Sequence, residues 1–265
     1  MTPLPSSPGN AFDPLAAFRL DGQVALVTGA SSGLGERFAR VLDAAGARVV
    51  ITARRGDRLE ALADQLTDPV VMPGDLTEPA WRDELVAAAV AQTGRLDVLV
   101  NNAGRSEPMR AFDENVDHFR TTLELNLVTP FAVAQAAAQT MADHQIAGSI
   151  INVSSIYALV GIGRVPEAGY SASKGGLTSL TRELASQWSR RDIRVNALAP
   201  GWFPSEMTTE MFGDARLGEW IADKTPLRRA GNPDELDGAL LFLASAASSF
   251  VTGQILAVDG GWTAI

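Results

Sequence analysis

The chain contains no cysteine, which excludes disulfides, thiolate metal sites and a cysteine nucleophile, and which fits a reducing compartment. Histidine is almost as scarce, with only His118 and His144 in 265 residues. Both fall in a helical stretch with mostly polar neighbours, so we interpret them as surface residues and not as a metal pair or a catalytic base. The sequence therefore predicts no metal site.

Long hydrophobic runs and an excess of positive charge are also missing. No apolar stretch reaches the roughly 18 residues that a membrane span needs. The formal charge is -9 and no basic patch is apparent, which makes nucleic acid and anionic membranes poor partners. The first ten residues lack the basic segment and apolar run of a signal peptide. We expect a cytoplasmic protein whose partner is a small molecule.

The sequence does contain short apolar runs that alternate with longer amphipathic segments from about Leu20 onward, a pattern typical of a parallel sheet. Several of the apolar runs are continuous, as expected for strands that are covered on both faces. We predict an α/β fold: one Rossmann-like domain (20–265), with a doubly wound parallel sheet of about seven strands and helices on both faces. Residues 1–19 are predicted to form an extension. The expected strands are 24–27, 48–52, 70–72, 96–100, 149–153, 194–197 and 255–258, and the expected helices are 35–45, 58–66, 79–92, 116–143, 170–189 and 234–246.

One segment, residues 202–227, breaks this rhythm and concentrates aromatic residues such as Trp202, Phe203 and Trp220. It predicts either a buried helix pair or an apolar lid over a site at the carboxyl edge of the sheet, where open α/β sheets bind ligands. Both interpretations remain open. We call residues 202–227 the lid segment.

A glycine-rich turn follows the first expected strand, with Gly29, Gly33 and Gly35 in a G-x-x-x-G-x-G pattern ahead of a helix. Such glycines let backbone N–H groups approach a pyrophosphate at the helix N-terminus, where the helix dipole favours negative charge. The turn therefore predicts a dinucleotide site.

The end of the second strand bears on the choice of dinucleotide. A carboxylate there would bind the ribose 2′-hydroxyl of NAD, whereas this strand is followed by Arg54 and Arg55, whose guanidinium groups suit a phosphate. We expect NADP(H) to be favoured over NAD(H), the alternative being that both arginines only solvate the start of a helix. Asp75, after the third strand, is expected either to accept from the adenine amino group or to cap the next helix.

Tyr170 and Lys174 are four residues apart on an expected helix, a spacing that places a phenol beside an ammonium. A cation within about 4 Å, at an effective dielectric of about 20, provides about 4 kcal/mol, enough to lower a phenol pKa by about 3 units. The pair therefore suits acid-base catalysis, and the alternative is an ordinary helix with a core tyrosine and a solvated lysine.

Pro130 supplies a further clue because it has no N–H group. The carbonyl of Asn126, four residues earlier, loses its helical partner, becomes free to hold a water, and marks an expected kink.

Taken together, these residues resemble the short-chain dehydrogenase/reductase family, in its single-domain branch of about 250 residues. The resemblance covers essentially everything after Leu20 and rests on five ordered motifs: Thr28-Gly29-x-x-x-Gly33-x-Gly35, Asn101-Asn102-Ala103-Gly104, Ser155, Tyr170-x-x-x-Lys174 and Pro200-Gly201.

The resemblance implies an NAD(P)H-dependent oxidoreductase that interconverts a carbonyl and a secondary alcohol. Tyr170 would be the general acid or base, Lys174 would lower the Tyr170 pKa and bind the nicotinamide ribose, and Ser155 would polarise the substrate oxygen. Asn126 would hold a water that connects Lys174 to solvent, and Asn196 would brace the site behind Pro200. The implied cofactor-binding residues are Gly29, Ser31, Ser32, Gly33, Leu34, Gly35, Arg54, Arg55, Asp75, Leu76, Asn102, Ala103, Gly104, Tyr170, Lys174, Pro200, Gly201, Phe203 and Ser205.

In one respect the chain departs from the family. Ser155 and Tyr170 are 15 positions apart where about 13 is usual, which we interpret as a two-residue insertion in 156–169, a loop that borders the substrate. Ser154 as the catalytic serine would lengthen this interval further. Hydrophobic ketones, 3-oxoacyl thioesters and sugars or polyols all remain open as substrates: the lid segment favours a bulky apolar substrate, whereas Arg105, Arg164 and Glu167 favour a polar or acidic one.

Two further expectations concern regulation and assembly. A catalytically silent NAD(P)-binding regulator is the alternative to an enzyme, although binding alone does not need all four candidate catalytic side chains. Small residues in 132–138 and 175–185 offer flat helix faces for close subunit packing. The family resemblance suggests a homotetramer.

Overall fold

The structure is a computed structural model that describes residues 13–265, apart from the side chains of residues 207, 210 and 211. Of the predicted extension, residues 13–19 belong to this part. They include a short 3₁₀ turn, η1 (Ala16–Phe18), which packs against a second one, η7 (Ala246–Ser248), while Leu15 stays exposed.

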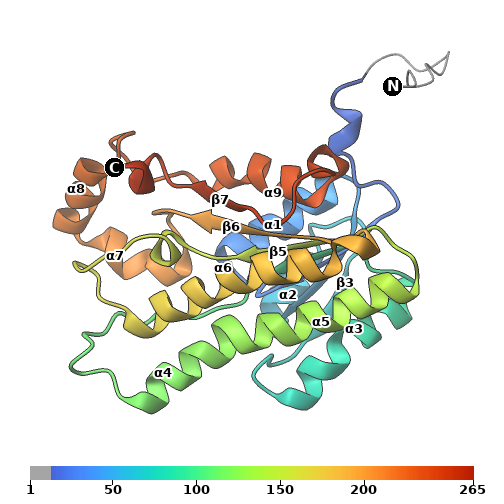
Figure 1. The fold of residues 1–265 in the computed structure, drawn as a ribbon, viewed down its shortest axis with the longest axis horizontal. Helices are drawn as coiled ribbons and strands as arrows, with labels where there is room; N and C mark the ends of the chain where they lie inside the picture. The colour runs from blue at the N-terminus through green and yellow to red at the C-terminus, as the bar shows by residue number, and fades with distance from the viewer. Residues whose placement is uncertain (1–12) are drawn as a thin grey trace.

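A seven-stranded parallel sheet forms the centre of the described chain (Figure 1), as predicted. The strand order β3-β2-β1-β4-β5-β6-β7 reverses direction between β1 and β4. The strands are β1 (Val24–Thr28), β2 (Arg48–Ala53), β3 (Val70–Pro73), β4 (Val98–Asn101), β5 (Ser149–Val153), β6 (Arg194–Pro200) and β7 (Ile255–Val258).

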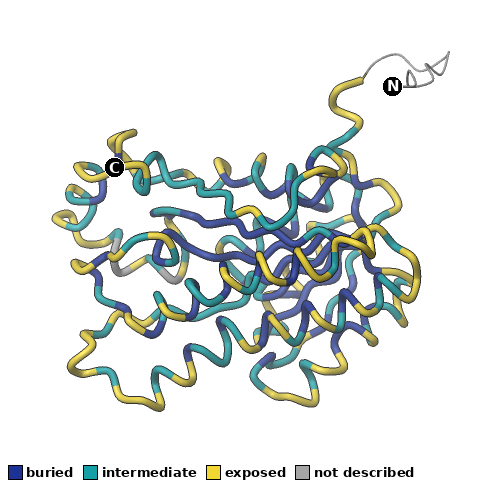
Figure 2. The backbone as a smooth tube through the Cα atoms, in the orientation of Figure 1, coloured by how far each residue is buried: buried dark blue, intermediate teal, exposed yellow. Residues whose placement is uncertain are grey.

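Helices cover both faces of the sheet, which explains why the central strands are buried along their whole length (Figure 2). On one face, Phe38 of α1, Leu59 of α2 and Leu240 of α9 share a core with the strands. On the other, α3, α5 and α6 contribute Leu85, Val133 and Leu184. The bounds are α1 (Gly33–Ala44), α2 (Gly56–Ala63), α3 (Pro79–Thr93), α4 (Val116–Leu123), α5 (Thr129–Asp143), α6 (Ala168–Trp188), α7 (Thr209–Gly213), α8 (Ala215–Lys224) and α9 (Asp237–Ala244).

The helix expected at 116–143 forms over this whole range. A π-helical turn, η2 (Glu124–Val128), joins α4 to α5 where the kink was expected, and the Thr129 N–H donates to the Glu124 carbonyl five residues back. Pro130 explains this wider turn, because it has no N–H to continue the α-helical ladder. The wider turn places Asn126, which is fully buried, inside the molecule.

The start of the last helix also differs from the expectation at 234–246. Residues Pro233–Leu236 form a 3₁₀ turn that Asn232 and Glu235 close as a reciprocal capping box, so α9 begins only at Asp237.

The lid segment forms the helix pair α7 and α8, and its tryptophans pack on each other. The ring of Trp202 meets Trp220 edge to face at 5.9 Å and Trp262, near the end of the chain, at 5.4 Å. Arg164 lies 5.4 Å from the ring centre of Trp220. Among the helices of residues 13–265, none combines the length and apolar character required to cross a membrane.

Candidate active site

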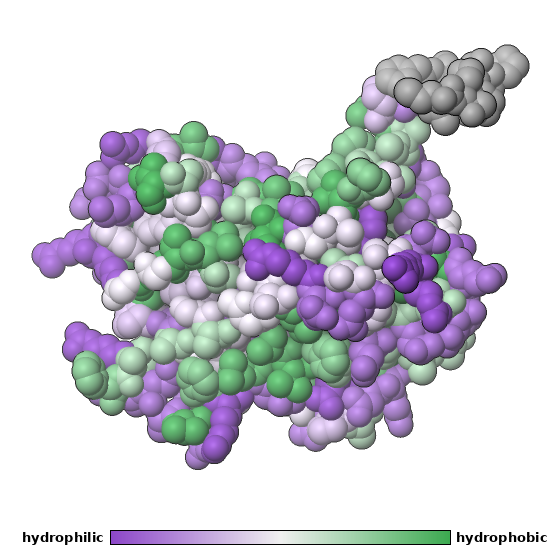
Figure 3. Space-filling model, in the orientation of Figure 1, coloured by the Kyte–Doolittle hydropathy of each residue, from purple (hydrophilic) through white to green (hydrophobic). Residues whose placement is uncertain are grey.

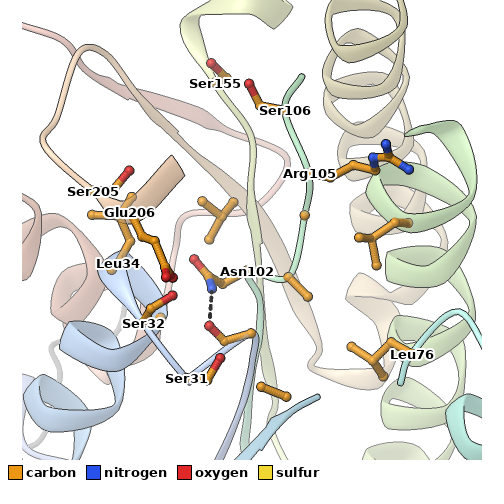
Figure 4. A pocket seen from close by; sticks show the side chains of 18 of the residues that line it. Ser31, Ser32, Leu34, Leu76, Asn102, Arg105, Ser106, Ser155, Ser205 and Glu206 are labelled. Carbon is orange, nitrogen blue, oxygen red and sulfur yellow. Dashed lines mark hydrogen bonds between the residues drawn. The ribbon is translucent and has the colours of Figure 1, made fainter. Parts of the chain in front are cut away.

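A cavity of about 500 Å³ opens at the carboxyl ends of the strands, near the point where the strand order reverses. This is where open α/β sheets bind their ligands. The cavity (Figure 4) brings together every residue that we predicted to be catalytic or cofactor-binding, except Asn126: Gly29, Ser31, Ser32, Gly33, Leu34, Gly35, Arg54, Arg55, Asp75, Leu76, Asn102, Ala103, Gly104, Ser155, Tyr170, Lys174, Pro200, Gly201, Phe203 and Ser205.

The glycine-rich turn lies between β1 and α1 and leaves no room for side chains. Gly29 and Gly33 have φ values of 69° and 57°, which disfavour any residue with a Cβ. A Cβ at Gly35 would overlap the Gly29 carbonyl oxygen and the Asn102 amide. The turn therefore presents bare backbone at the N-terminus of α1, and it fits a pyrophosphate.

Thr28 fixes the loop after β4 against this turn, a role that sequence reasoning missed. Its Oγ1 accepts from the N–H groups of Asn102 and Ala103, both at 3.0 Å. The Asn102 side chain in turn donates to the Thr28 carbonyl at 2.9 Å. These contacts hold the two sides of the nucleotide cavity together.

Arg54 and Arg55 both line the cavity, but their surroundings differ. Arg54 is exposed, whereas Arg55 donates to the hydroxyl of Ser32 at 2.7 Å and to both carboxylate oxygens of Glu206, each at 2.8 Å. Arg55 therefore does not merely solvate a helix. The sequence analysis did not predict that Glu206 lines the cavity. The signal was an acidic residue next to Ser205, which could have been proposed as an ion-pair partner for the two arginines after β2.

Asp75 closes a local turn and does not cap a helix, so that alternative was wrong. Its Oδ1 accepts from the Thr77 N–H at 2.9 Å and from the Thr77 hydroxyl at 2.8 Å. The N-cap of α3 is Glu78, and Pro79 follows it at the first helical position. Adenine recognition by Asp75 remains a prediction.

The structure distinguishes the two candidate serines after β5. Ser154 is buried and its hydroxyl donates to the Lys174 carbonyl at 3.3 Å. Ser155 accepts from the Tyr157 N–H at 3.3 Å, which leaves its own proton available, and its hydroxyl favours the ionised form of Tyr170. The geometry thus favours Ser155 as the hydroxyl that faces a substrate oxygen.

Tyr170 and Lys174 lie in the first two turns of α6, as the spacing predicts. The Lys174 ammonium is buried, donates to the Val153 carbonyl at 2.7 Å and lies 5.6 Å from the centre of the Tyr170 ring. Burial lowers the pKa of Lys174 to about 8. Burial also raises the pKa of Tyr170 above its ordinary value, which the Ser155 hydroxyl opposes. The predicted lowering of the Tyr170 pKa is therefore not seen in this structure, because desolvation of the phenol outweighs the hydrogen bond from Ser155.

Asn126 lies behind the cavity and holds the loop after β4. Its side chain exchanges two 2.8 Å hydrogen bonds with the backbone of Arg105, and its Nδ2 also reaches the Ser173 hydroxyl at 3.2 Å. Water binding by its carbonyl remains a prediction. Asn196 does not brace the site behind Pro200 as expected, because it lies in the first half of β6. Its side chain donates to the Val251 carbonyl and accepts from the Gln254 N–H, in the segment before β7.

The end of the cavity near Ser155 is polar. Ser106 lies beside Ser155 there (Figure 4), and its hydroxyl donates to Glu167, which is 7% exposed. Arg105 also lines the cavity, and its guanidinium pairs with Glu107. Burial raises the pKa of Glu167 to about 7. Sequence reasoning gave no role to Ser106.

His118, in α4, is partly buried beside two carboxylates, so its assignment to the surface was only partly correct. Its ring nitrogens lie 3.0 Å from Glu114 and 3.0 Å from Glu107, and the side chain is 14% exposed. Hydrogen bonds to both carboxylates raise its pKa. His144 is exposed, as expected. Among the side chains that the structure describes, no group of three or more histidines and carboxylates is arranged to hold a metal ion.

Comparison with known proteins agrees with this site. A family model described as Enoyl-(Acyl carrier protein) reductase matches residues 29–263. The chain is 36% identical over 255 residues to 2-dehydro-3-deoxy-D-gluconate 5-dehydrogenase of Escherichia coli (94% of this chain and 99% of that one). It is 39% identical over 251 residues to galactitol 2-dehydrogenase (L-tagatose-forming) of Cereibacter sphaeroides (93% and 97%). A gluconate 5-dehydrogenase of Burkholderia cenocepacia, solved with NADP and tartrate, superposes with a TM-score of 0.90 at 37% identity, covering 96% of this chain and all of that one.

Fold, site and relatives together define a nicotinamide-dependent oxidoreductase. The chain belongs to the short-chain dehydrogenase/reductase family. It is an enzyme that interconverts a carbonyl and an alcohol, so the alternative of a catalytically silent regulator is set aside.

Proposed function

We propose that this enzyme acts on a polyhydroxylated ketone or alcohol, with a sugar acid or polyol as the substrate class and NADP(H) as the preferred cofactor. The observation that carries the proposal is that Ser106 and Ser155 lie close together at one end of the cavity (Figure 4), which is also lined by Arg105, an arginine that pairs with Glu107 in this structure. A guanidinium suits a carboxylate, and hydroxyls suit a polyol. The names of the relatives, which act on gluconate derivatives and galactitol, agree with this class.

The proposal departs from the apolar substrate that the lid segment favoured in the sequence. Trp202 and Trp220 pack against each other and against Trp262, and none of these three rings lines the cavity. Of the aromatic residues in the lid segment, Phe203 lines the cavity, where we predict cofactor contact. The two lid tryptophans therefore serve packing and not substrate contact.

For the reaction, we assign proton transfer to Tyr170 and binding of the substrate oxygen to Ser155. The cofactor, when bound, supplies or accepts the hydride. In reduction, the Tyr170 phenol donates its proton to the carbonyl oxygen, and the Ser155 hydroxyl donates a hydrogen bond to the same oxygen. The protonated Lys174 holds the cofactor ribose and stabilises the phenolate that forms, which compensates for the burial of the phenol. Asn126 positions the loop that carries Arg105, and its carbonyl is the proposed water site.

NADP(H) is favoured because cations, and no carboxylate, follow β2. Arg54 is exposed at the cavity wall, and Arg55 lies against Ser31 and Ser32 of the nucleotide turn. Guanidinium and hydroxyl groups together suit a 2′-phosphate.

We also propose a homotetramer. Figure 3 shows apolar side chains gathered over the face where α5 and α6 run in Figure 1. Val128, just before α5, and Phe131, in its first turn, are 42% and 38% exposed. Exposed apolar residues on neighbouring helices are typical of subunit interfaces.

The function is tested by following NADPH oxidation with a keto-sugar acid, a neutral ketose and a simple aliphatic ketone. We expect turnover to be fastest with the keto acid and to fall by about three orders of magnitude or more in Tyr170→Phe, which keeps the ring but loses the proton donor. Arg105→Met should lower kcat/KM for the keto-sugar acid and leave kcat/KM for the neutral ketose unchanged. Faster turnover of the aliphatic ketone, or full activity of Tyr170→Phe, would refute the proposal.

A further inference from the structure

Glu206 joins the two sides of the nucleotide cavity at its adenosine end. Both terminal nitrogens of Arg55 donate to its carboxylate at 2.8 Å, and Arg58 donates at 3.0 Å. Glu206 belongs to the lid segment, whereas Arg55 and Arg58 follow β2. Figure 4 shows Glu206 and Ser205 near Leu34 and Ser32 of the nucleotide turn.

Arg55 is directed to the nucleotide turn by further contacts. Its Nη2 donates to the hydroxyls of Ser31 at 3.1 Å and Ser32 at 2.7 Å, in addition to Glu206. The guanidinium therefore meets four acceptor oxygens, from three residues in two segments, an arrangement that resembles the oxygens of a phosphate. Hydrogen bonding to Arg55 also lowers the pKa of Glu206, which keeps this carboxylate charged at neutral pH.

We propose that Glu206 is a specificity-determining residue that competes with the cofactor 2′-phosphate for Arg55 and so limits the preference for NADP(H) over NAD(H). The inference rests on the proposed function, which places a 2′-phosphate at Arg55. A phosphate monoester carries more charge and more acceptor oxygens than a carboxylate, so it displaces Glu206 from the guanidinium. A cofactor without this phosphate leaves the ion pair intact.

The competition has a structural consequence for the lid segment. Ser205 and Thr208 close a small capping box around Glu206, with the Ser205 N–H donating to the Thr208 hydroxyl at 2.8 Å. When the 2′-phosphate takes Arg55, Glu206 keeps only Arg58 of its two arginine partners on the nucleotide side of the cavity. NADP(H) therefore loosens the turn before α7, and NAD(H) does not.

Glu206→Gln tests the competition, because it keeps the size of the side chain and removes the charge. Titration calorimetry with 2′,5′-ADP and 5′-AMP as probes isolates the phosphate from the nicotinamide and from the substrate. We expect Glu206→Gln to lower the Kd for 2′,5′-ADP about tenfold and to change the Kd for 5′-AMP less than about twofold. Asp223→Asn is the matched control. Asp223 belongs to the lid segment and forms an exposed ion pair of 2.9 Å with Arg228, and neither residue lines the cavity.

Unchanged or weaker binding of 2′,5′-ADP to Glu206→Gln, or an equal gain for 5′-AMP, would overturn the inference. Glu206→Ala repeats the test, and thermal melting confirms that each variant is folded. Arg55→Ala separates the two proposals. If Arg55→Ala loses the preference for 2′,5′-ADP while Glu206→Gln leaves it unchanged, only this inference fails; if the parent shows no preference for 2′,5′-ADP, both the NADP(H) assignment and the competition fail.

Discussion

The side chain of Asn126 binds the backbone of Arg105 in both directions. Its Oδ1 accepts from the Arg105 N–H at 2.8 Å, and its Nδ2 donates to the Arg105 carbonyl at 2.8 Å. A residue in a π-helical turn thereby fixes the loop that carries the polar end of the cavity. Two amide hydrogen bonds thus connect the π-helical turn to the site.

We expect Asn126→Ala to lower the free energy of unfolding by about 2–4 kcal/mol, because it leaves both backbone groups of Arg105 without partners. The variant should also raise KM for the substrate, since Arg105 is then free to move. Chemical denaturation and steady-state kinetics measure the two effects. Asn115→Ala is the control, because it removes only the N-cap of α4. It should lower the free energy of unfolding by about 1 kcal/mol and leave KM unchanged. Equal KM values in both variants would contradict the positioning role.

The pKa of about 8 for Lys174 predicts a pH profile for reduction. Because the proposed role needs the ammonium, kcat/KM should fall as pH rises through about 8. The same shift means that protonated Lys174 opposes folding, so stability from this residue should rise between about pH 8 and 10.5. A kcat/KM profile that stays flat to pH 9.5 would show that the charge is not required or that the cofactor holds the proton in place.

Glu167→Gln should stabilise the protein in a pH-dependent way. The pKa of Glu167 is raised from 4.5 to about 7 by burial, so the folded state disfavours the carboxylate above pH 7, whereas below pH 4.5 the carboxyl is protonated in both states. Glutamine mimics the protonated acid, and its advantage should reach about 3 kcal/mol at pH 8 and disappear at pH 4.5. Urea denaturation at both values measures it, with the exposed Glu60→Gln as control. A gain that does not depend on pH would exclude the carboxylate as its cause.

Two glycine-to-alanine changes should alter thermal stability in opposite directions. Gly35→Ala would force a Cβ into the Gly29 carbonyl and the Asn102 amide, so we expect lost cofactor binding and lower thermal stability. Gly218 lies inside α8 with nothing within 4 Å of a Cβ, so Gly218→Ala should stabilise by about 0.5–1 kcal/mol. Cofactor fluorescence titration and thermal melting distinguish the two. Normal cofactor binding by Gly35→Ala would mean that the turn has room to relax.

The proposed assembly predicts a change of mass in Phe131→Asp. A carboxylate in the apolar face of α5 would be buried without a partner in a subunit interface, so light scattering should show a smaller species than for the parent. Leu15→Asp places the same charge on an exposed apolar residue outside α5 and should leave the mass unchanged. A parent that is monomeric at micromolar concentration would refute the tetramer directly.

The fold and most of the site could be predicted because their signals are local. Strands covered on both faces appear as unbroken Val, Ile and Leu runs, and all seven expected strands form. The glycines of the nucleotide turn, and the four-residue spacing of Tyr170 and Lys174, are likewise encoded within a few positions.

The missed features depend on residues far apart in the chain. Glu206 meets Arg55 across 151 positions, and Ser106 meets Glu167 across 61. The Tyr170 pKa was misjudged because helix spacing gives the distance to a cation but not the extent to which the fold desolvates the phenol. His118 was placed at the surface because its neighbours in the sequence are mostly polar, whereas the loop before α4 brings Glu107 and Glu114 to its ring.

The stacking of Trp202, Trp220 and Trp262 gives the enzyme an optical label of its own. Their ring centres lie 5.1–5.9 Å apart, close enough for their excited states to couple, whereas the other two tryptophans, Trp81 and Trp188, pack against a separate core that α3, α5 and α6 share with the sheet. Near-ultraviolet circular dichroism of the coupled rings therefore reports on the packing of the lid segment against the segment that contains Trp262. Movement of α8 can be followed in solution without attaching a dye.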